Sequence, residues 1–181
     1  MTKFVVLLRG INVGGKNILP MEELRELLEK LGCENVATYI QSGNAVFRYR
    51  GNAAELPDLI ATAIDSRFGF KPSVMVLTAG EFDAVAKANP FAADASEPKF
   101  LHVWFLREPA ISANTTRMGE LESGGEKFLL TDPAVYLYAP DGIGRSKLAA
   151  GMEKCLGVPA TARNWRTVSK IGEMLSKVEV C

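Results

Sequence analysis

The sequence predicts an α+β protein of two ferredoxin-like βαββαβ repeats in tandem, each an antiparallel sheet with helices on one face. Over residues 1–78 the apolar patterns follow the order strand, helix, strand, strand, helix, strand. A similar order returns after a connector rich in alanine, proline and acidic residues. We therefore expect a first repeat over 1–78, a helix and connector over 79–98, and a second repeat with a C-terminal helix over 99–181.

The first repeat opens with an apolar run at residues 4–8, which predicts a buried strand. A helix is expected from Pro20 to Gly32, because four leucines fall at i, i+3, i+4 and i+7 and form one stripe: Leu24, Leu27, Leu28 and Leu31. Residues 36–49 alternate on both sides of Ser42-Gly43, which predicts a hairpin.

The next elements are marked by polar residues at helix ends. Asn52 and Glu55 form a variant of the capping box, which predicts a helix that ends at Gly69. A strand is expected over 73–77. Thr78 and Glu81 have the same spacing and predict a further short helix.

In the second half, residues 100–106 predict a strand, and a weakly patterned helix is expected over about 112–121. Strands over 128–131 and 135–138 are expected to pair across Asp132-Pro133, since these residues suit a type I turn. Two helices follow, separated by a short strand near Ala160. Their apolar positions are Leu148, Met152, Cys155 and Leu156, then Val168, Ile171, Gly172 and Leu175.

Composition excludes several classes of protein. The formal net charge is zero, which argues against a generally basic nucleic-acid-binding surface. The chain has three cysteines and one histidine and lacks a CxxC pair, so we expect reduced thiols, no metal site and no cofactor. The first apolar run is too short for a signal peptide, and we expect a cytoplasmic protein without a membrane segment.

The loop at residues 10–17 is the most suggestive segment, because it joins a strand to a helix and satisfies the pattern GxxxxGK. Asn17 stands where a phosphate-binding P-loop needs Ser or Thr, so a true P-loop is disfavoured. Two readings stay open. The glycines either build a tight turn or direct backbone N–H groups at an anion.

Basic residues gather in three segments, 7–17, 140–148 and 161–170. These segments hold seven of the 21 basic residues and one of the 21 acidic residues, Asp141. The segregation favours a local positive site, although three separate solvated loops would give the same count. The candidate anion-binding residues are Arg9, Asn12, Gly14, Gly15, Lys16, Asn17, Gln41, Asn44, Arg145, Lys147, Arg163 and Arg166.

Three further side chains have a functional and a structural interpretation. Trp165 lies between two arginines and suits stacking on a base, but its spacing to Val168 also suits packing. His102 lies in an apolar strand, where a structural role is favoured over catalysis because no nucleophile motif accompanies it. Asn44 and Gln41 lie at the hairpin tip, where turn formation and ligand binding are both open.

Four strings, LLRGINVGGKN (7–17), YIQSGN (39–44), DGIGRSKL (141–148) and TARNWRT (161–167), resemble the domain of unknown function 1697 family. They lie near both ends and in the middle of the chain, so the resemblance extends over essentially all of it. It implies an α+β fold of ferredoxin-like repeats. It implies no activity, substrate or catalytic residue.

The leading hypothesis is a protein that binds a phosphorylated small molecule or nucleotide, with Lys16, Arg145 and Arg166 around the backbone of loop 10–17. The first alternative is single-stranded nucleic-acid binding, since ferredoxin-like sheets can present stacking aromatics. The second is an enzyme whose positive site stabilises developing negative charge, although the sequence shows no nucleophile or paired-carboxylate motif. The catalytic residues and the oligomeric state stay undefined.

Overall fold

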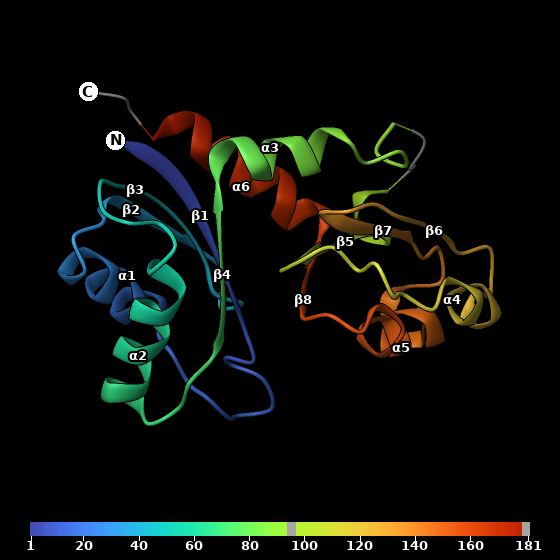
Figure 1. The fold of residues 1–181 in the computed structure, drawn as a ribbon, viewed down its shortest axis with the longest axis horizontal. Helices are drawn as coiled ribbons and strands as arrows, with labels where there is room; N and C mark the ends of the chain where they lie inside the picture. The colour runs from blue at the N-terminus through green and yellow to red at the C-terminus, as the bar shows by residue number, and fades with distance from the viewer. Residues whose placement is uncertain (94–96, 179–181) are drawn as a thin grey trace. The chain divides into compact units, whose positions relative to one another are not determined.

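A computed structural model describes residues 1–93 and 97–178 (Figure 1). By its internal contacts the chain divides into two compact units. The first comprises Met1–Ala84 and Lys170–Cys181, and the second comprises Val85–Ser169. The end of the C-terminal helix therefore groups with the first unit, whereas the sequence suggested that this helix goes with the second repeat over 99–181.

The first unit has the order expected of a βαββαβ repeat, followed by a third helix. Its elements are β1 (Thr2–Arg9), α1 (Met21–Lys30), β2 (Glu34–Tyr39), β3 (Asn44–Tyr49), α2 (Leu56–Phe68), β4 (Ser73–Thr78) and the start of α3 (Ala79–Lys87). The strand order is β2-β3-β1-β4, and every pairing is antiparallel. This is the order of a ferredoxin-like sheet.

Helices α1 and α2 lie side by side on one face of this sheet (Figure 1). Alternate residues of β1 face them, and Phe4, Val6 and Leu8 are buried there with Leu24 and other core residues. Of the predicted leucine stripe, Leu24, Leu27 and Leu28 are buried. Leu31 is only partly buried because it is already the C-cap residue of α1.

The second unit repeats the arrangement. Its elements are η1 (Pro98–Phe100), β5 (Leu101–Leu106), α4 (Thr115–Leu121), β6 (Lys127–Leu130), β7 (Ala134–Tyr138), η2 (Ile143–Arg145), α5 (Lys147–Leu156), β8 (Ala160–Asn164) and the start of α6 (Trp165–Lys177). The antiparallel strand order β6-β7-β5-β8 corresponds strand by strand to that of the first unit. The tandem ferredoxin-like fold is therefore confirmed.

Helices α4 and α5 cover one face of the second sheet (Figure 1). Trp104 and Leu106 of β5 pack there with Met118 of α4 and Met152 of α5. The predicted helix near residue 112 starts later, at Thr115, because Asn114 caps it by accepting a hydrogen bond from the Arg117 N–H at 2.9 Å.

The reverse face of each sheet also makes a contact with a helix of its own unit, which the one-face arrangement did not anticipate. In the first unit, Lys3 on the face of β1 that carries Val5 donates to the Leu175 carbonyl of α6 at 3.1 Å. In the second unit, the buried Tyr136 hydroxyl donates to the Val85 carbonyl of α3 at 2.8 Å. β1 and β5 bury side chains on both faces.

Two local expectations need correction. The hairpin between β2 and β3 is closed by the four residues 40–43 rather than by Ser42-Gly43 alone, since Tyr39 pairs with Asn44. Asn52 does bond the Glu55 carboxylate, at 2.8 Å, but this pair lies in the turn before α2, whose helix starts at Leu56. By contrast, Thr78 and Glu81 form the reciprocal bonds of a capping box at α3.

Candidate functional site

Loop 10–17 of the first unit is a miniature hairpin. Val13 and Lys16 form an isolated antiparallel bridge, and the Lys16 N–H donates to the Val13 carbonyl at 3.0 Å. Gly14 and Gly15 lie between them with φ of 57° and 73°, so the turn has the positive φ values that favour glycine. The glycines thus have a structural role, and the exposed Lys16 side chain lies at the base of the turn.

Asn12 joins this hairpin to the turn between β2 and β3. Its amide nitrogen donates to the carbonyls of Leu19 at 2.9 Å and Gln41 at 2.8 Å, and its amide oxygen accepts from the Leu19 N–H at 2.8 Å. Asn17 has a similar role, because its amide donates to the Gly10 carbonyl at 2.7 Å. Both asparagines adopt positive φ. Their side chains therefore order the loop.

The turn at 40–43 is fixed by a buried amide and by a close approach of backbone. Asn44 is fully buried, and its amide donates to the Tyr39 carbonyl and to the Ser42 hydroxyl, each at 2.9 Å. A Cβ on Gly43 would lie 2.7 Å from atoms of both Leu8 and Ile11. Turn formation thus accounts for Asn44, while the Gln41 side chain is exposed.

In the second unit, α5 begins directly after a short 3-10 turn. Ser146 is its N-cap and accepts a hydrogen bond from the Ala149 N–H at 2.9 Å. Arg145 and Lys147 flank this buried serine, and both side chains are exposed. The sequence-predicted cations at this junction are therefore accessible beside the positive end of a helix.

At the junction of β8 and α6, Asn164 is the organising residue. Its amide oxygen accepts from the Arg166 N–H at 3.0 Å, and its amide nitrogen donates to the Lys99 carbonyl at 2.9 Å. The Arg166 side chain is exposed. Trp165, the first residue of α6, is half-buried.

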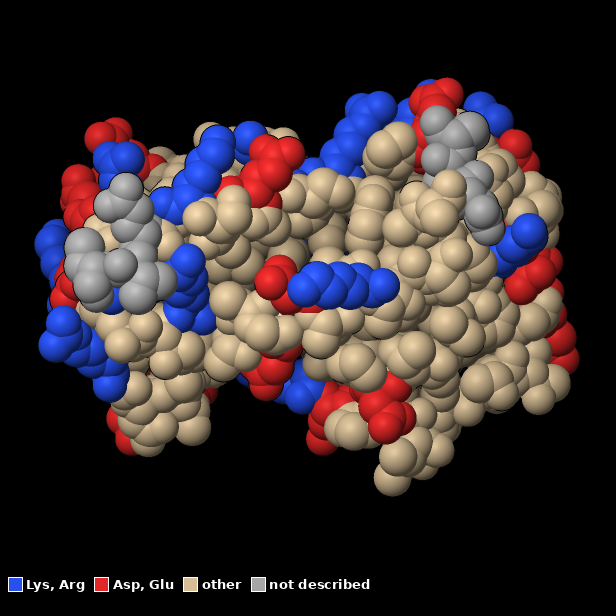
Figure 2. All heavy atoms as spheres, turned by 90° about the horizontal axis from the view of Figure 1, so that it is seen from above, with Lys and Arg blue, Asp and Glu red and all other residues tan. Residues whose placement is uncertain are grey.

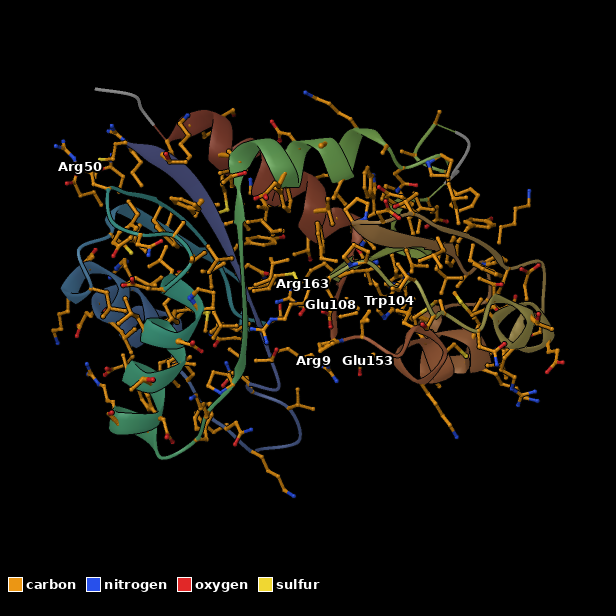
Figure 3. All side chains as sticks on the ribbon, in the orientation of Figure 1. Arg9, Arg50, Trp104, Glu108, Glu153 and Arg163 are labelled. Atoms are coloured by element: carbon orange, nitrogen blue, oxygen red, sulfur yellow. The ribbon has the colours of Figure 1, made fainter. Side chains whose placement is uncertain are left out.

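Arg163, labelled in Figure 3, differs from the other candidate cations because it is only 8% exposed. Its guanidinium donates to the Ala162 carbonyl at 2.8 Å. Burial lowers the pKa of Arg163 to about 10, so the side chain still carries its charge near neutral pH. Arg9, also labelled, is exposed at the end of β1 in the first unit.

The predicted anion-binding residues thus divide between the two units. The first unit holds Arg9, Asn12, Gly14, Gly15, Lys16, Asn17, Gln41 and Asn44, and the second holds Arg145, Lys147, Arg163 and Arg166. A common site for Lys16, Arg145 and Arg166 stays a prediction. Over the face drawn in Figure 2, basic and acidic side chains are interspersed.

A cavity of about 270 Å³ lies within the second unit, between α4 and α5. Its lining comes from one stripe of each helix: Asn114, Arg117 and Leu121 from α4 and its cap, and Lys147, Gly151, Lys154 and Cys155 from α5. The two helices run antiparallel, since the Asn114 N–H donates to the Cys155 carbonyl at 2.8 Å while Leu121 lies beside Gly151.

Gly151 opens this cavity. A Cβ at this position would lie 2.9 Å from Cδ1 of Leu121, so a larger residue would displace the leucine. Leu121, Gly151 and the buried Cys155 form an apolar floor. The exposed side chains of Arg117, Lys147 and Lys154 surround it with positive charge.

The three cations are not equivalent. Arg117 donates to the Glu120 carboxylate at 2.7 Å, in a pair whose side chains are each 55% exposed. Within the described part of the chain, neither Lys147 nor Lys154 has a carboxylate at salt-bridge distance. Exposed ion pairs contribute little, so the Arg117 guanidinium can turn to a ligand at small cost.

Sequence reasoning identified only Lys147 of this cavity. Arg117, Lys154 and Gly151 were missed because they lie inside helices, where a charged residue normally faces solvent. The stripe Lys147, Gly151 and Lys154, spaced i, i+4 and i+7, was the available indication, since glycine is costly inside a helix.

Among the described residues, Cys33, Cys155 and His102 are all buried. Burial raises the pKa of the Cys33 thiol to about 12, which makes it unreactive. Cys33 and Cys155 are buried and take part in no disulfide, while Cys181 lies outside the described residues. Within residues 1–93 and 97–178, no three His, Cys, Asp or Glu side chains gather as a metal site would require. None of the helices described is long and apolar enough to cross a membrane.

Residues 1–136 match the family described as "Protein of unknown function (DUF1697)". The chain belongs to this family. The match includes the loop 10–17 and the turn 40–43, whereas the basic segments at 141–148 and 161–167 lie beyond it.

The fold of this DUF1697 chain is similar to that of a solved structure, the conserved bacterial protein SP0830 from Streptococcus pneumoniae. The two share 29% sequence identity with a TM-score of 0.75, over 96% of this chain and 98% of the other. The similarity therefore extends over both units and includes the region beyond residue 136. Comparison with curated proteins gives no match.

Proposed function

We propose that this protein binds a phosphorylated small molecule in the cavity between α4 and α5. The observation that carries the proposal is the lining of the cavity, where Arg117, Lys147 and Lys154 surround an apolar floor. Phosphate is the anion that such a set suits, because lysine and arginine donate charge-assisted hydrogen bonds to its oxygens. The apolar floor suits the carbon part of the ligand.

The size of the cavity restricts the ligand. Its volume of about 270 Å³ is near the lower end of the range for small-molecule sites. A sugar phosphate or a phosphorylated metabolite of similar size fits this volume better than a dinucleotide.

The alternative of single-stranded nucleic-acid binding has less support. Recognition on a ferredoxin-like sheet requires exposed aromatic side chains on its strands. Phe4, Phe47 and Trp104 pack on the faces covered by α1, α2, α4 and α5. On the reverse face of the second sheet, Phe105 and Tyr136 are buried. On the reverse faces, where such stacking would occur, Lys3 of β1 bonds α6 and Tyr136 of β7 bonds α3.

An enzymatic function likewise lacks a supporting group in the lining of the cavity. The cavity lining contains no carboxylate or imidazole, and its thiol, Cys155, is 5% exposed. Ligand binding is therefore the function that this geometry supports best.

Binding should be tested by calorimetry with glucose 6-phosphate, inorganic phosphate and glucose as probes. We expect the sugar phosphate to bind, the sugar not to bind, and affinity to fall as salt rises. Lys154→Gln should weaken binding, and Lys127→Gln should not, because Lys127 is an exposed residue of β6 outside the cavity. An equal loss of affinity for the sugar phosphate in both variants would contradict a site at the cavity.

The site predicted from sequence alone makes a different prediction in the same experiment. If Lys16, Arg145 and Arg166 form a common anion site, Lys16→Ala and Arg145→Ala should weaken binding. Neither residue lines the cavity, so the cavity proposal expects both variants to bind normally. The two pairs of variants therefore distinguish the two locations.

A further inference from the structure

We infer that the cavity is built for a ligand with two anionic groups, one at each end, as in a bisphosphorylated small molecule. The inference rests on the proposed function and goes further by specifying the ligand class. It is carried by the separation of the two lysines along α5, with the apolar floor between them.

Lys147 and Lys154 lie on the same stripe of α5, because seven residues turn an α-helix through almost two complete turns. Their Cα atoms are therefore displaced by about 10 Å along the helix axis. A single phosphate is far smaller than this separation, so it can engage the two ammonium groups together only if both side chains bend toward the middle.

The middle of the cavity does not favour a charged group. Gly151 lies between the lysines and has no side chain, and the end of Leu121 packs directly against it. A phosphate placed there would lose hydration against an apolar surface. The carbon part of a ligand has no such cost.

Arg117, the third cation, lies at one end of the cavity. Asn114 bonds the Cys155 carbonyl near the end of α5, and Arg117 follows one helical turn later on α4. Since the helices are antiparallel, Arg117 faces the Lys154 half rather than the Lys147 half. We assign one anionic group to Arg117 and Lys154 and the other to Lys147.

The test compares hexane-1,6-diyl bisphosphate with hexyl phosphate, which has the same carbon chain and one phosphate. We expect the bisphosphate to bind the full-length protein at least about tenfold more tightly, because the second contact is intramolecular. Ethane-1,2-diyl bisphosphate has two phosphates but too short a chain, and it should bind no better than hexyl phosphate.

Variants locate the two contacts. Lys147→Gln should reduce the affinity for the long bisphosphate to that of hexyl phosphate and leave the affinity for hexyl phosphate unchanged. Lys154→Gln should weaken the binding of both the long bisphosphate and hexyl phosphate. Lys127→Gln is the matched control, because it also removes one positive charge, and it should change neither of the two affinities. Circular dichroism of each variant establishes that the fold is retained.

The possible failures are distinguishable. Equal affinity for the long bisphosphate and hexyl phosphate would overturn the two-anion inference and leave the proposed function standing. If none of the three probes binds at low salt, both fail. If the short bisphosphate binds as tightly as the long one, total ligand charge explains the binding and the inference is wrong.

Discussion

The Nε2 atom of His102 lies 3.3 Å from the amide nitrogen of Asn164, on the strand paired with it. The orientation of the Asn164 amide is fixed, because its oxygen accepts from the Arg166 N–H and its nitrogen donates to the Lys99 carbonyl. The nitrogen facing His102 is thus a donor, which suits Nε2 as an acceptor. This contact and the burial of the ring both favour the neutral form of His102.

The first prediction concerns the pKa of this histidine. Burial lowers it from the ordinary value of 6.5, and an interaction with the Phe100 backbone offsets part of the effect. The imidazole is the single one in the chain, so its NMR titration needs no assignment by mutagenesis. We expect a midpoint below 6.5. A midpoint above 6.5 would contradict the neutral assignment.

Because the pKa of His102 is lowered in the folded state, the free energy of unfolding depends on pH. When pH falls below 6.5, the unfolded chain takes up the histidine proton before the folded chain does, and the folded state loses stability. His102→Gln should reduce this loss, since the glutamine oxygen can accept from Asn164 without titrating. Chemical denaturation at pH 7 and pH 5 measures the difference, and an unchanged pH dependence would exclude His102 as its source.

A second prediction compares two residues of one loop. Asn12→Ala removes three hydrogen bonds and places alanine at a φ of 53°, so it should lower the free energy of unfolding by about 2–3 kcal/mol. Lys16→Ala, in the same hairpin but exposed, should change it by less than about 0.5 kcal/mol. Urea unfolding followed by far-UV circular dichroism, which reports on both units, measures both. A similar change in the free energy of unfolding for the two variants would refute the structural role of Asn12.

A third prediction uses two glycines of similar backbone conformation. Gly10 and Gly43 have φ of 80° and 76°, but a Cβ meets nothing within 4 Å at Gly10 and lies 2.7 Å from Leu8 and Ile11 at Gly43. Gly10→Ala should cost about 1 kcal/mol through φ alone. Gly43→Ala should cost clearly more, because core atoms must also move. Equal melting temperatures for the two variants would disprove the close packing at Gly43.

The last prediction separates stability from binding at Gly151. Alanine there improves helix propensity by up to about 1 kcal/mol, and the flexible end of Leu121 can move away from the new methyl group. Gly151→Ala should therefore retain or raise the melting temperature. It should also lower the affinity for the sugar phosphate, because the leucine is displaced into the cavity. A stabilised variant with unchanged affinity would show that the ligand does not use this cavity.

Much of the fold could be predicted because its local patterns agree with its tertiary packing. The leucines of α1 and the alternation around β2 and β3 identify elements whose order determines a ferredoxin-like unit. Tertiary context determined the rest. Nothing in the sequence near Lys3 indicates that its ammonium group meets the Leu175 carbonyl, 172 residues later.

The candidate site was less predictable for a related reason. Asn12, Asn17 and Asn44 have the composition of a ligand-binding loop, yet in the structure their amides bind backbone carbonyls of the same loops. Sequence identifies a polar side chain without identifying its partner. The cavity, in turn, depends on how α4 packs against α5, and the spacing within either helix does not specify that packing.

The placement of residues 170–178 with the first unit has a consequence for biosynthesis. The ribosome releases β1 to β4 early, but the helical segment that supplies the Leu175 carbonyl emerges only after the whole of the second unit. Until then, the face of β1 that carries Val5 and Leu7 lacks this cover. The nascent first unit therefore acquires this contact only after the second unit has left the ribosome, so this face of its sheet is open to chaperones while the second unit is being synthesised.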